Sequence, residues 1–296
     1  MAELLLRHGA KPNRSPNSLK QTTVLGLAIS LHRLDVVKLL FDHGALVDDE
    51  THCEDFGRDA TGGPKPVHVA TLIDTNILDF LLNNGAKADT TCRLGDIQRI
   101  TPLHLAFDEA AAKRLISAGA SVFAVDSQGE TPLFWAVKAW LEAALRAGKP
   151  SRKTEMQGWQ RPPLPNWYSN PAKRAIVWAR NLSLPPKSFA EMRDGAFAAI
   201  KVLLAHGSPV NLRDGKCNTP LYYLSSTLSM DGTPREGALG LAAAALLEAS
   251  AELDVKTRQA ADSSSKLLAE EKSRNLVFER ETLLGFHDHD VYYLYP

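Results

Sequence analysis

Cysteine is scarce in this sequence, and the few that occur are scattered. The chain of 296 residues holds three cysteines, Cys53, Cys92 and Cys217, and no two of them form a CxxC pair. A disulfide framework needs several cysteines at short spacing in an oxidising compartment. The low count argues against such a framework and favours a reducing environment, so a cytoplasmic or nuclear protein is the default expectation.

Long apolar runs and a net charge are also missing. The start, MAELLLRHGAKPN, has three leucines in a row before a basic and polar continuation, and GLAAAALLEA at 240–249 is too short to span a bilayer. We therefore predict neither a signal peptide nor membrane association. Basic and acidic residues number 34 each, so the molecule as a whole is not expected to bind a polyanion.

Recognisable catalytic motifs are absent as well. The sequence has no GxSxG, HExxH or GxGxxG pattern. The stretch GRDATGGPK at 57–65 superficially suggests a phosphate loop, but Gly63 and Pro64 stand where the loop needs its lysine. Cys217 has no assignable base. We expect no enzymatic activity, no cofactor and no metal.

The sequence does contain a repeated pattern. Gly-Ala pairs recur at intervals of 35, 41 and 34 residues, starting at positions 9, 44, 85 and 119, with Gly207-Ser208 and Ser250-Ala251 in the same context. A second signal precedes most of them: TVLGLA at 23, KPVHVA at 65, TPLHLA at 101, TPLFWA at 131 and NTPLYY at 218. Between the signals lie segments with helical apolar spacing, such as LDVVKLLFDHGA at 34–45. Such periods are typical of stacked structural units.

Each part of the pattern has a physical reason. A threonine before proline offers a hydroxyl that caps a helix, and proline is tolerated in the first helical turn because its missing N–H is not needed there. Glycine after the apolar segment suits the left-handed backbone that ends a helix. Two short helices cannot bury their apolar faces alone, so we expect copies to stack.

This pattern resembles the ankyrin-repeat family. The resemblance covers about residues 1–254 and rests on Thr101-Pro102-Leu103-His104-Leu105-Ala106, Thr131-Pro132-Leu133, Thr219-Pro220-Leu221 and the helix endings VVKLLFDHGA, LDFLLNNGA and IKVLLAHGS. It implies an all-α fold, an ankyrin-repeat solenoid of about five to six helix-turn-helix repeats. It also implies that His68 and His104 form hydrogen bonds within and between repeats, and that partners bind at finger tips and the concave helix face.

The predicted array has irregular ends. A half repeat at 1–14 leaves Leu4 and Leu5 uncovered, so we expect a marginal N-terminal repeat. Residues 255–296 lack the pattern, and a helix at 265–284 is expected to cap the C-terminal face. Between these ends the repeats are predicted near 21–48, 63–89, 99–122, 129–211 and 217–254.

A long insertion, about 141–193, interrupts the fifth repeat. Thr131 and Gly207 lie 76 residues apart, against 21 from Thr23 to Gly44. The insertion holds ten basic and three acidic residues and three of the chain's five tryptophans. We predict that KAWLEAALRAG at 138–148 extends the first helix, that NPAKRAIVWARN at 170–181 forms a short helix, and that the partner helix begins near 195.

We predict a non-catalytic scaffold or adaptor that binds another protein. Tryptophan and arginine dominate interface energetics, so the insertion is expected to add a contact. Its charge favours a partner with an acidic patch. The candidate contact residues are Trp159, Arg161, Trp167, Tyr168, Lys173 and Arg174. Alternatively, the tryptophans pack back on the array, or they stack on bases; nucleic acid is the less favoured partner because no binding module for it is recognisable.

Two further hypotheses stay open. In the first, the chain is an enzyme or a metal- or cofactor-dependent protein, with the insertion and the tail forming a lid; the weak metal candidates are His287, Asp288, His289 and Asp290. In the second, the chain is a fragment of a larger regulatory protein. The acidic link at 46–66 is interpreted as a solvated loop, with an acidic recognition finger as the alternative.

Overall fold

The computed structural model describes residues 2–13, 23–47, 62–94, 96–147, 187–227 and 236–251, and this part of the chain is mostly helical. None of its helices is long and apolar enough to cross a membrane. The elements are α1 (Ala2–Arg7), α2 (Val24–Ser30), α3 (Leu34–Asp42), α4 (Pro66–Ile73), α5 (Thr75–Asn83), β1 (Cys92–Leu94), β2 (Ile97–Ile100), the 3-10 helix η2 (Pro102–Leu105), α6 (Glu109–Ser117), α7 (Pro132–Ala147), α9 (Phe189–Ala205), α10 (Pro220–Thr227) and α11 (Glu236–Glu248).

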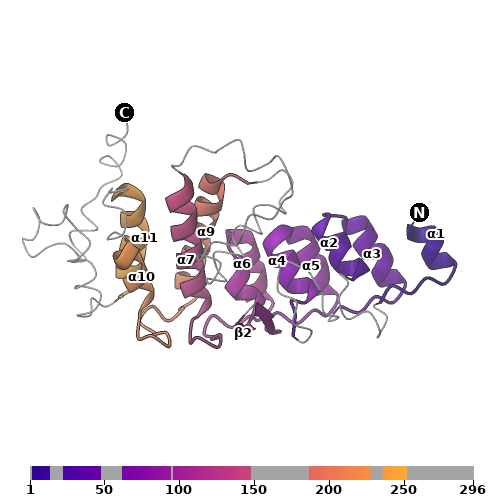
Figure 1. Cartoon of the computed structure of the whole chain (residues 1–296), viewed down its shortest axis with the longest axis horizontal. Helices are drawn as coiled ribbons and strands as arrows, with labels where there is room; N and C mark the ends of the chain where they lie inside the picture. The colour runs from indigo at the N-terminus through magenta and orange to yellow at the C-terminus, as the bar shows by residue number, and fades with distance from the viewer. Residues whose placement is uncertain are drawn as a thin grey trace, which may run out of the picture.

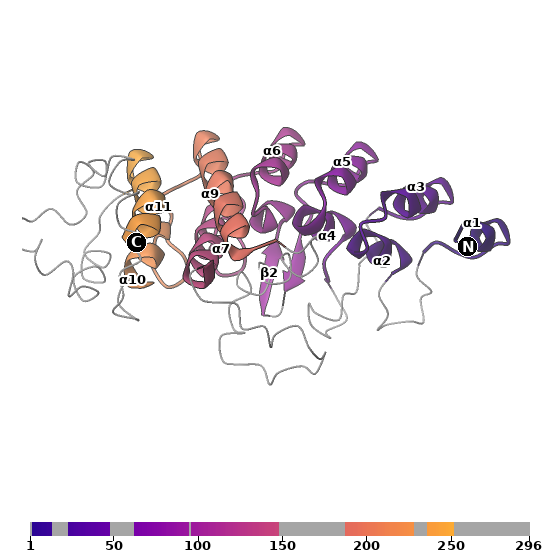
Figure 2. The same ribbon diagram turned by 90° about the horizontal axis from the view of Figure 1, so that it is seen from above.

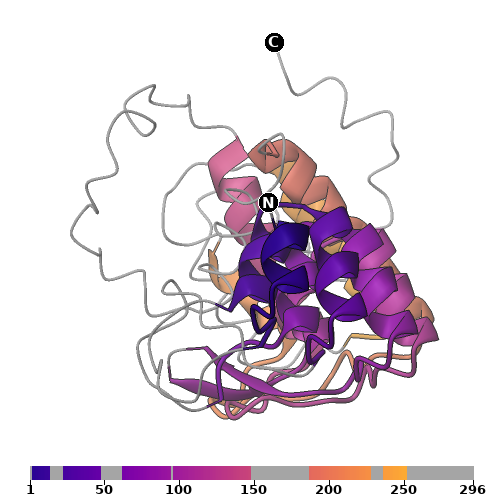
Figure 3. The same ribbon diagram turned by 90° about the vertical axis from the view of Figure 1, so that its right-hand side faces the viewer.

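The helices lie in two rows along the long axis of the molecule (Figures 1 and 2). In the first row α2 packs on α4, α4 on η2, η2 on α7 and α7 on α10. In the second row α3, α5, α6, α9 and α11 contact one another in that order, and α1 lies at the far end. The turns gather along one edge, below the helices, together with the two strands (Figure 3). The apolar core lies between the two rows.

Proline marks the start of helices in the first row. Four elements begin with it: Pro66 in α4, Pro102 in η2, Pro132 in α7 and Pro220 in α10. The threonine caps predicted from the sequence are confirmed at two helices: the Thr23 hydroxyl accepts a hydrogen bond from the Gly26 N–H at 3.0 Å, and that of Thr219 accepts one at 3.3 Å. The prediction is wrong at α7, because the buried Thr131 hydroxyl has no hydrogen-bond partner in the described part of the chain.

Glycine ends the helices of the second row, as predicted. Gly9, Gly44, Gly85, Gly119 and Gly207 all have φ between 77° and 92°. In each case the next residue's N–H donates to the carbonyl five residues earlier, at 2.9–3.0 Å, as Ala10 does to Leu5 and Ala120 to Leu115. This is the bond pattern of a glycine-terminated helix. Ser250, with φ of 69°, occupies the same position after α11.

The predicted all-α fold is wrong at one place, because β1 and β2 form a two-stranded antiparallel hairpin. The reason is chain length: Gly85 and Thr101 are 16 residues apart, whereas Gly119 and Thr131 are 12 apart. The additional residues extend the turn. Cys92, Leu94, Ile97 and Ile100 then bury their side chains, which stabilises the two short strands.

The helices that flank the predicted insertion, 141–193, confirm the expectation at its first end and correct it at its second. Helix α7 continues to Ala147, which confirms the expected extension. Helix α9 begins at Phe189 rather than near 195, because Ser188 and Glu191 form a capping box. The Ser188 hydroxyl accepts from the Glu191 N–H at 3.1 Å, and the Glu191 carboxylate accepts from the Ser188 N–H at 2.6 Å.

The early start of α9 compensates for a short element in the first row. The distance from Thr101 to Gly119 is only 18 residues, and η2 is a single 3-10 turn where its neighbours are α-helices. Helix α9 packs on α6, and its early residues Glu191, Met192 and Gly195 lie beside Leu105 and Phe107. Gly195 comes so close to the link between η2 and α6 that a Cβ would lie 3.0 Å from the Phe107 carbonyl oxygen. A hollow of about 20 Å³, room for roughly one water, remains between them.

Candidate functional site: two aspartate turns and a fingertip row

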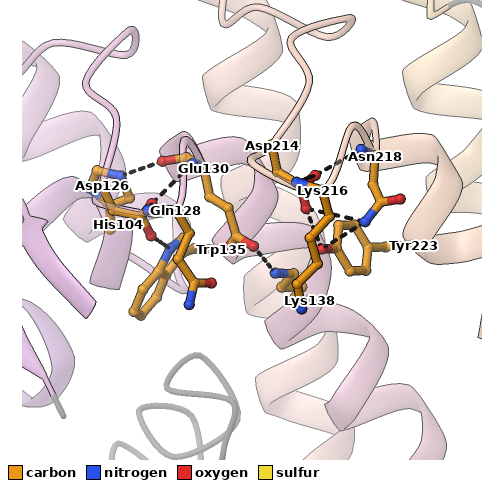
Figure 4. Close-up of polar contacts among 10 residues, drawn as sticks. All are labelled: His104, Asp126, Gln128, Glu130, Trp135, Lys138, Asp214, Lys216, Asn218 and Tyr223. Carbon is orange, nitrogen blue, oxygen red and sulfur yellow. Dashed lines mark hydrogen bonds and ion pairs between the residues drawn. The ribbon is translucent and has the colours of Figure 1, made fainter. Parts of the chain in front are cut away.

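Residues 126–130 form a turn around one buried carboxylate (Figure 4). Asp126 is inaccessible to solvent, and its Oδ1 accepts hydrogen bonds from the N–H groups of Gln128 at 2.8 Å and Glu130 at 3.0 Å. Aspartate favours such turns because its short side chain reaches the backbone two residues on. The other oxygen, Oδ2, accepts from Trp135 Nε1 at 3.0 Å. The carboxylate therefore fixes both the turn and the start of α7.

Residues 214–218 repeat this construction, and we call the two segments the aspartate turns. Asp214 Oδ1 accepts from the N–H groups of Lys216 at 2.9 Å and Asn218 at 2.7 Å. The Tyr223 hydroxyl donates to Oδ2 at 2.5 Å. Burial opposes ionisation of Asp214, but these hydrogen bonds outweigh it and lower the pKa of its carboxyl. Burial and the bond to Asp214 raise the pKa of Tyr223.

A buried ion pair joins the two aspartate turns. Lys138 of α7 contacts the Glu130 carboxylate, and both residues are less than one-tenth exposed. The Lys138 ammonium also lies 4.2 Å from the centre of the Tyr223 ring, so it faces the second turn. Burial raises the pKa of the Glu130 carboxyl, which Lys138 opposes. Lys138 thus contacts Glu130 of the first aspartate turn and the ring of Tyr223, whose hydroxyl binds Asp214 of the second aspartate turn.

Backbone hydrogen bonds hold neighbouring turns in register. The Ser127 N–H donates to the Gln98 carbonyl at 2.9 Å, and the Gly215 N–H donates to the Gln128 carbonyl at 2.7 Å. Gly215 permits the second approach, since a Cβ there would lie 3.1 Å from the Gln128 oxygen. The Arg99 guanidinium also reaches across, and its Nη2 donates to the Asp126 carbonyl at 2.6 Å. We call Gln98, Arg99, Gln128 and Lys216, which are all exposed, the fingertip row.

His68 and His104 form the hydrogen bonds expected from the sequence. His68 Nδ1 accepts from the Lys65 N–H at 3.2 Å, and its Nε2 donates to the Ile100 carbonyl at 3.1 Å. His104 does the same with the Thr101 N–H and the Glu130 carbonyl, at 3.1 Å each. Burial lowers the pKa of His68 to about 3 and that of His104 to about 4. Both rings are therefore neutral and connect successive helix pairs.

The buried polar side chains of this site already have partners within the protein. The buried carboxylates of both aspartate turns are already occupied by backbone and aromatic donors, and the two buried imidazoles by backbone groups. Within the described ranges no three His, Cys, Asp or Glu side chains are placed to hold a metal ion.

Most of the site residues predicted from the sequence lie outside the described residues. This holds for the six candidates in the insertion (Trp159, Arg161, Trp167, Tyr168, Lys173 and Arg174), for 48–61 of the acidic link and for the tail at 287–290. The aspartate turns were not predicted. Their signal is an aspartate five residues before Thr-Pro-Leu with Trp or Tyr two residues beyond, at 126–135 and again at 214–223.

A scan of the chain against models of known protein families finds no match, and neither does a search of curated proteins. The function is therefore inferred from the residues of this chain.

Proposed function

We propose that this protein is a non-catalytic scaffold of the ankyrin-repeat type that binds another protein. The two rows of helices, the proline and glycine positions and the bridging histidines support this class. The observation that carries the proposal is the fingertip row, whose turns are tied to one another by backbone hydrogen bonds. A cytoplasmic or nuclear location agrees with the scattered cysteines.

A pre-organised row of this kind suits binding. Each tip is anchored by a buried side chain or by its neighbour, so little backbone freedom is lost when a partner binds. The row offers the amides of Gln98 and Gln128 and the cations of Arg99 and Lys216. These groups donate hydrogen bonds and carry positive charge, so they fit a partner segment with exposed carboxylates and carbonyls.

We further propose that the insertion adds a second contact, through Trp159, Arg161, Trp167, Tyr168, Lys173 and Arg174. Its two ends are attached to the longest helices, since α7 ends at Ala147 and α9 is capped by Ser188. A basic, tryptophan-bearing segment anchored in this way complements an acidic partner.

Matched variants test the fingertip row. The double variant Gln128→Glu, Lys216→Glu reverses its charge, and Asn83→Glu, Lys201→Glu makes the same change in charge at exposed positions of the second row. Partners captured by the intact chain are identified by quantitative mass spectrometry, purified and titrated by calorimetry. We expect affinity to fall at least tenfold for the fingertip variant and to persist in the control. Equal binding by all three proteins would contradict the proposal.

The insertion is tested separately, by replacing residues 149–186 with a short Gly-Ser linker between α7 and Ser188. If the six candidate residues contact the purified partner, its affinity falls while that of the fingertip control is unchanged. Undiminished affinity would remove the insertion from the binding surface and leave the fingertip row as the contact.

A further inference from the structure

The hairpin of β1 and β2 has one residue more on β2 than on β1. The strands pair Cys92 with Ile100 and Leu94 with Ile97, which leaves two residues of β2 opposite one of β1. Such a bulge changes the direction in which side chains point. In a regular strand, positions three apart lie on opposite faces, but here Ile97 and Ile100 are both buried. The bulge therefore leaves both residues between them, Gln98 and Arg99, on the exposed side.

The bulge holds Arg99 in a backbone conformation that favours other residue types. Its φ is 61°, in the left-handed region. Glycine adopts this region freely, and asparagine adopts it more readily than most residues do. The backbone alone therefore gives no reason for arginine at this position, and the reason has to lie in the side chain.

The Arg99 guanidinium is oriented, but its charge is not matched. Its Nη2 donates to the Asp126 carbonyl at 2.6 Å, a group without formal charge. Among the described residues no carboxylate forms an ion pair with it, including that of Asp96 on the same hairpin. Four other arginines do contact carboxylates: Arg7 with Glu3, Arg33 with Asp35, Arg114 with Asp79 and Arg193 with Asp194.

The donors that remain on Arg99 fit a carboxylate. A guanidinium has five N–H donors in a planar fork, and the Asp126 carbonyl accepts from one of them. Two of the others can bind both oxygens of a carboxylate in parallel, which is the strongest common pairing of arginine. Because the carbonyl already orients the group, less side-chain freedom is lost when such a partner binds.

We propose that Arg99 is the specificity-determining residue of the fingertip row and binds the carboxylate of an aspartate or glutamate in an acidic segment of the partner. The inference rests on the function proposed for the row and names the group on which its selectivity depends.

Substitutions that suit the backbone test this role. Arg99→Asn removes the guanidinium, and Arg99→Lys keeps the charge without the planar fork. We expect affinity for the purified partner, measured by calorimetry, to fall at least about 30-fold for Arg99→Asn and about 10-fold for Arg99→Lys. Arg114→Asn, at an arginine that already pairs with Asp79, is the control and should bind as the intact chain does.

The melting temperature separates recognition from support of the fold. Asparagine suits the left-handed backbone and only one hydrogen bond is lost, so Arg99→Asn should melt within about 3 °C of the intact chain. A larger fall would show that Arg99 holds the fold together and would contradict the proposal. If Arg99→Asn kept full affinity while Gln128→Glu, Lys216→Glu lost it, the scaffold would stand and the role of Arg99 would be refuted.

A hexaglutamate peptide tests the site without the partner. We expect it to shift the side-chain Nε–H signal of Arg99 in NMR spectra of the full chain, whereas hexaglutamine should leave the signal in place. Equal effects of the two peptides would overturn the carboxylate assignment. Loss of the purified partner's affinity after phosphatase treatment would assign a phosphate to Arg99 and equally contradict it.

Discussion

Cys217 occupies a backbone position that the other aspartate turn fills with glycine. Its φ is 59°, and the corresponding Gly129 has φ of 77°. A left-handed backbone costs a side-chain-bearing residue about 1–2 kcal/mol, whereas glycine adopts it freely. We expect Cys217→Gly to raise the free energy of unfolding by about 0.5 kcal/mol in urea denaturation, after glycine's greater freedom in the unfolded chain is subtracted.

The reverse change is the control. Gly129→Ala puts a side chain on the same backbone, and its Cβ would lie 3.4 Å from the Gly215 nitrogen. It should lower the free energy of unfolding by about 1 kcal/mol. If Cys217→Gly destabilised the protein instead, the equivalence of the two turns would be refuted.

The two bridging histidines predict a pH dependence. Their folded-state pKa values, about 3 for His68 and about 4 for His104, lie below the ordinary value of 6.5. As pH falls below 6.5, the unfolded chain binds protons that the folded chain does not, so stability is complete above this pH and is lost below it. Each histidine should lower the free energy of unfolding by about 2 kcal/mol between pH 7 and pH 5.

Urea denaturation at pH 7 and pH 5 measures this loss. His104→Gln should reduce the difference between the two pH values by about 2 kcal/mol, because one titrating group is removed. His43→Gln, at an exposed histidine, is the control and should keep the full difference. If His104→Gln lost as much free energy of unfolding between pH 7 and pH 5 as the intact chain does, the assignment of a neutral, buried ring to His104 would be contradicted.

At the scale of the residue, some roles are readable from sequence and others are not. His104 is readable because its partners lie at fixed offsets from Thr-Pro-Leu. Asp126 is not, because an aspartate in a polar turn has the composition of an ordinary solvated loop. Its burial depends on Trp135, nine residues later, whose indole N–H turns back once α7 has formed. The second occurrence at Asp214 and Tyr223 is the only sequence signal.

Helix α9 has a glycine where it passes close to the link between η2 and α6. In an open helix Gly→Ala stabilises by about 0.5–1 kcal/mol. At Gly195 a Cβ would lie 3.0 Å from the Phe107 carbonyl, so the two elements must separate. We expect Gly195→Ala to lower the free energy of unfolding by about 1–2 kcal/mol, as overpacking does.

A second variant on α9 shows whether helix propensity or packing decides the direction of the stability change at Gly195. Ala198→Gly should also destabilise, by about 1 kcal/mol, because glycine replaces a strong helix former at a half-buried position. Opposite substitutions that both destabilise α9 would show that packing decides at Gly195. A gain in stability for Gly195→Ala would mean that α9 does not approach the Phe107 carbonyl so closely.

The ion pair of Lys138 and Glu130 tests how strongly adjacent elements are coupled. Either Glu130→Gln or Lys138→Met leaves a buried charge without its partner, which typically costs about 3–5 kcal/mol. The double variant should cost clearly less than the sum, with a coupling above about 1 kcal/mol. The exposed pair of Glu109 and Lys113 is the control and should show no measurable coupling. Additive losses at the buried pair would refute the link between turns.

The element boundaries agree with the positions of proline and glycine where the distance between these positions is constant along the sequence. They depart from the prediction where that distance is longer or shorter. Proline and glycine located the ends of α4 and α5, because both act through backbone geometry alone. The hairpin at 92–100 forms where the chain between a helix-ending glycine and the next threonine is a few residues longer than elsewhere. The single turn of η2 forms where the chain between a threonine and the next helix-ending glycine is a few residues shorter. The conformation of these two segments depends on the space that the neighbouring elements leave. The periodicity of the sequence carries no information about that space.

At the scale of the whole molecule, each helix pair depends on its neighbours, so stability should vary along the rows. Within the described part of the chain the N-terminal end has little support, because α1 buries none of its residues, whereas α6 buries Ala111, Ala112 and Leu115 completely. Segments with few buried contacts open locally at low free energy. We therefore expect α1 to exchange its amide hydrogens much faster than α6, by at least about 100-fold.

Two backbone amides in the same kind of hydrogen bond allow this comparison between α1 and α6. The Ala10 N–H bonds to the Leu5 carbonyl at 3.0 Å, and the Ala120 N–H bonds to the Leu115 carbonyl at 2.9 Å, each just after a left-handed glycine. The hydrogen bonds are alike, so a difference in their exchange, measured by NMR or mass spectrometry, reports packing alone. Equal protection of Ala10 and Ala120 would mean that α1 is held as firmly as the interior. In that case stability would not decline toward the N-terminal end, and the exposure of Leu4 and Leu5 would need another explanation.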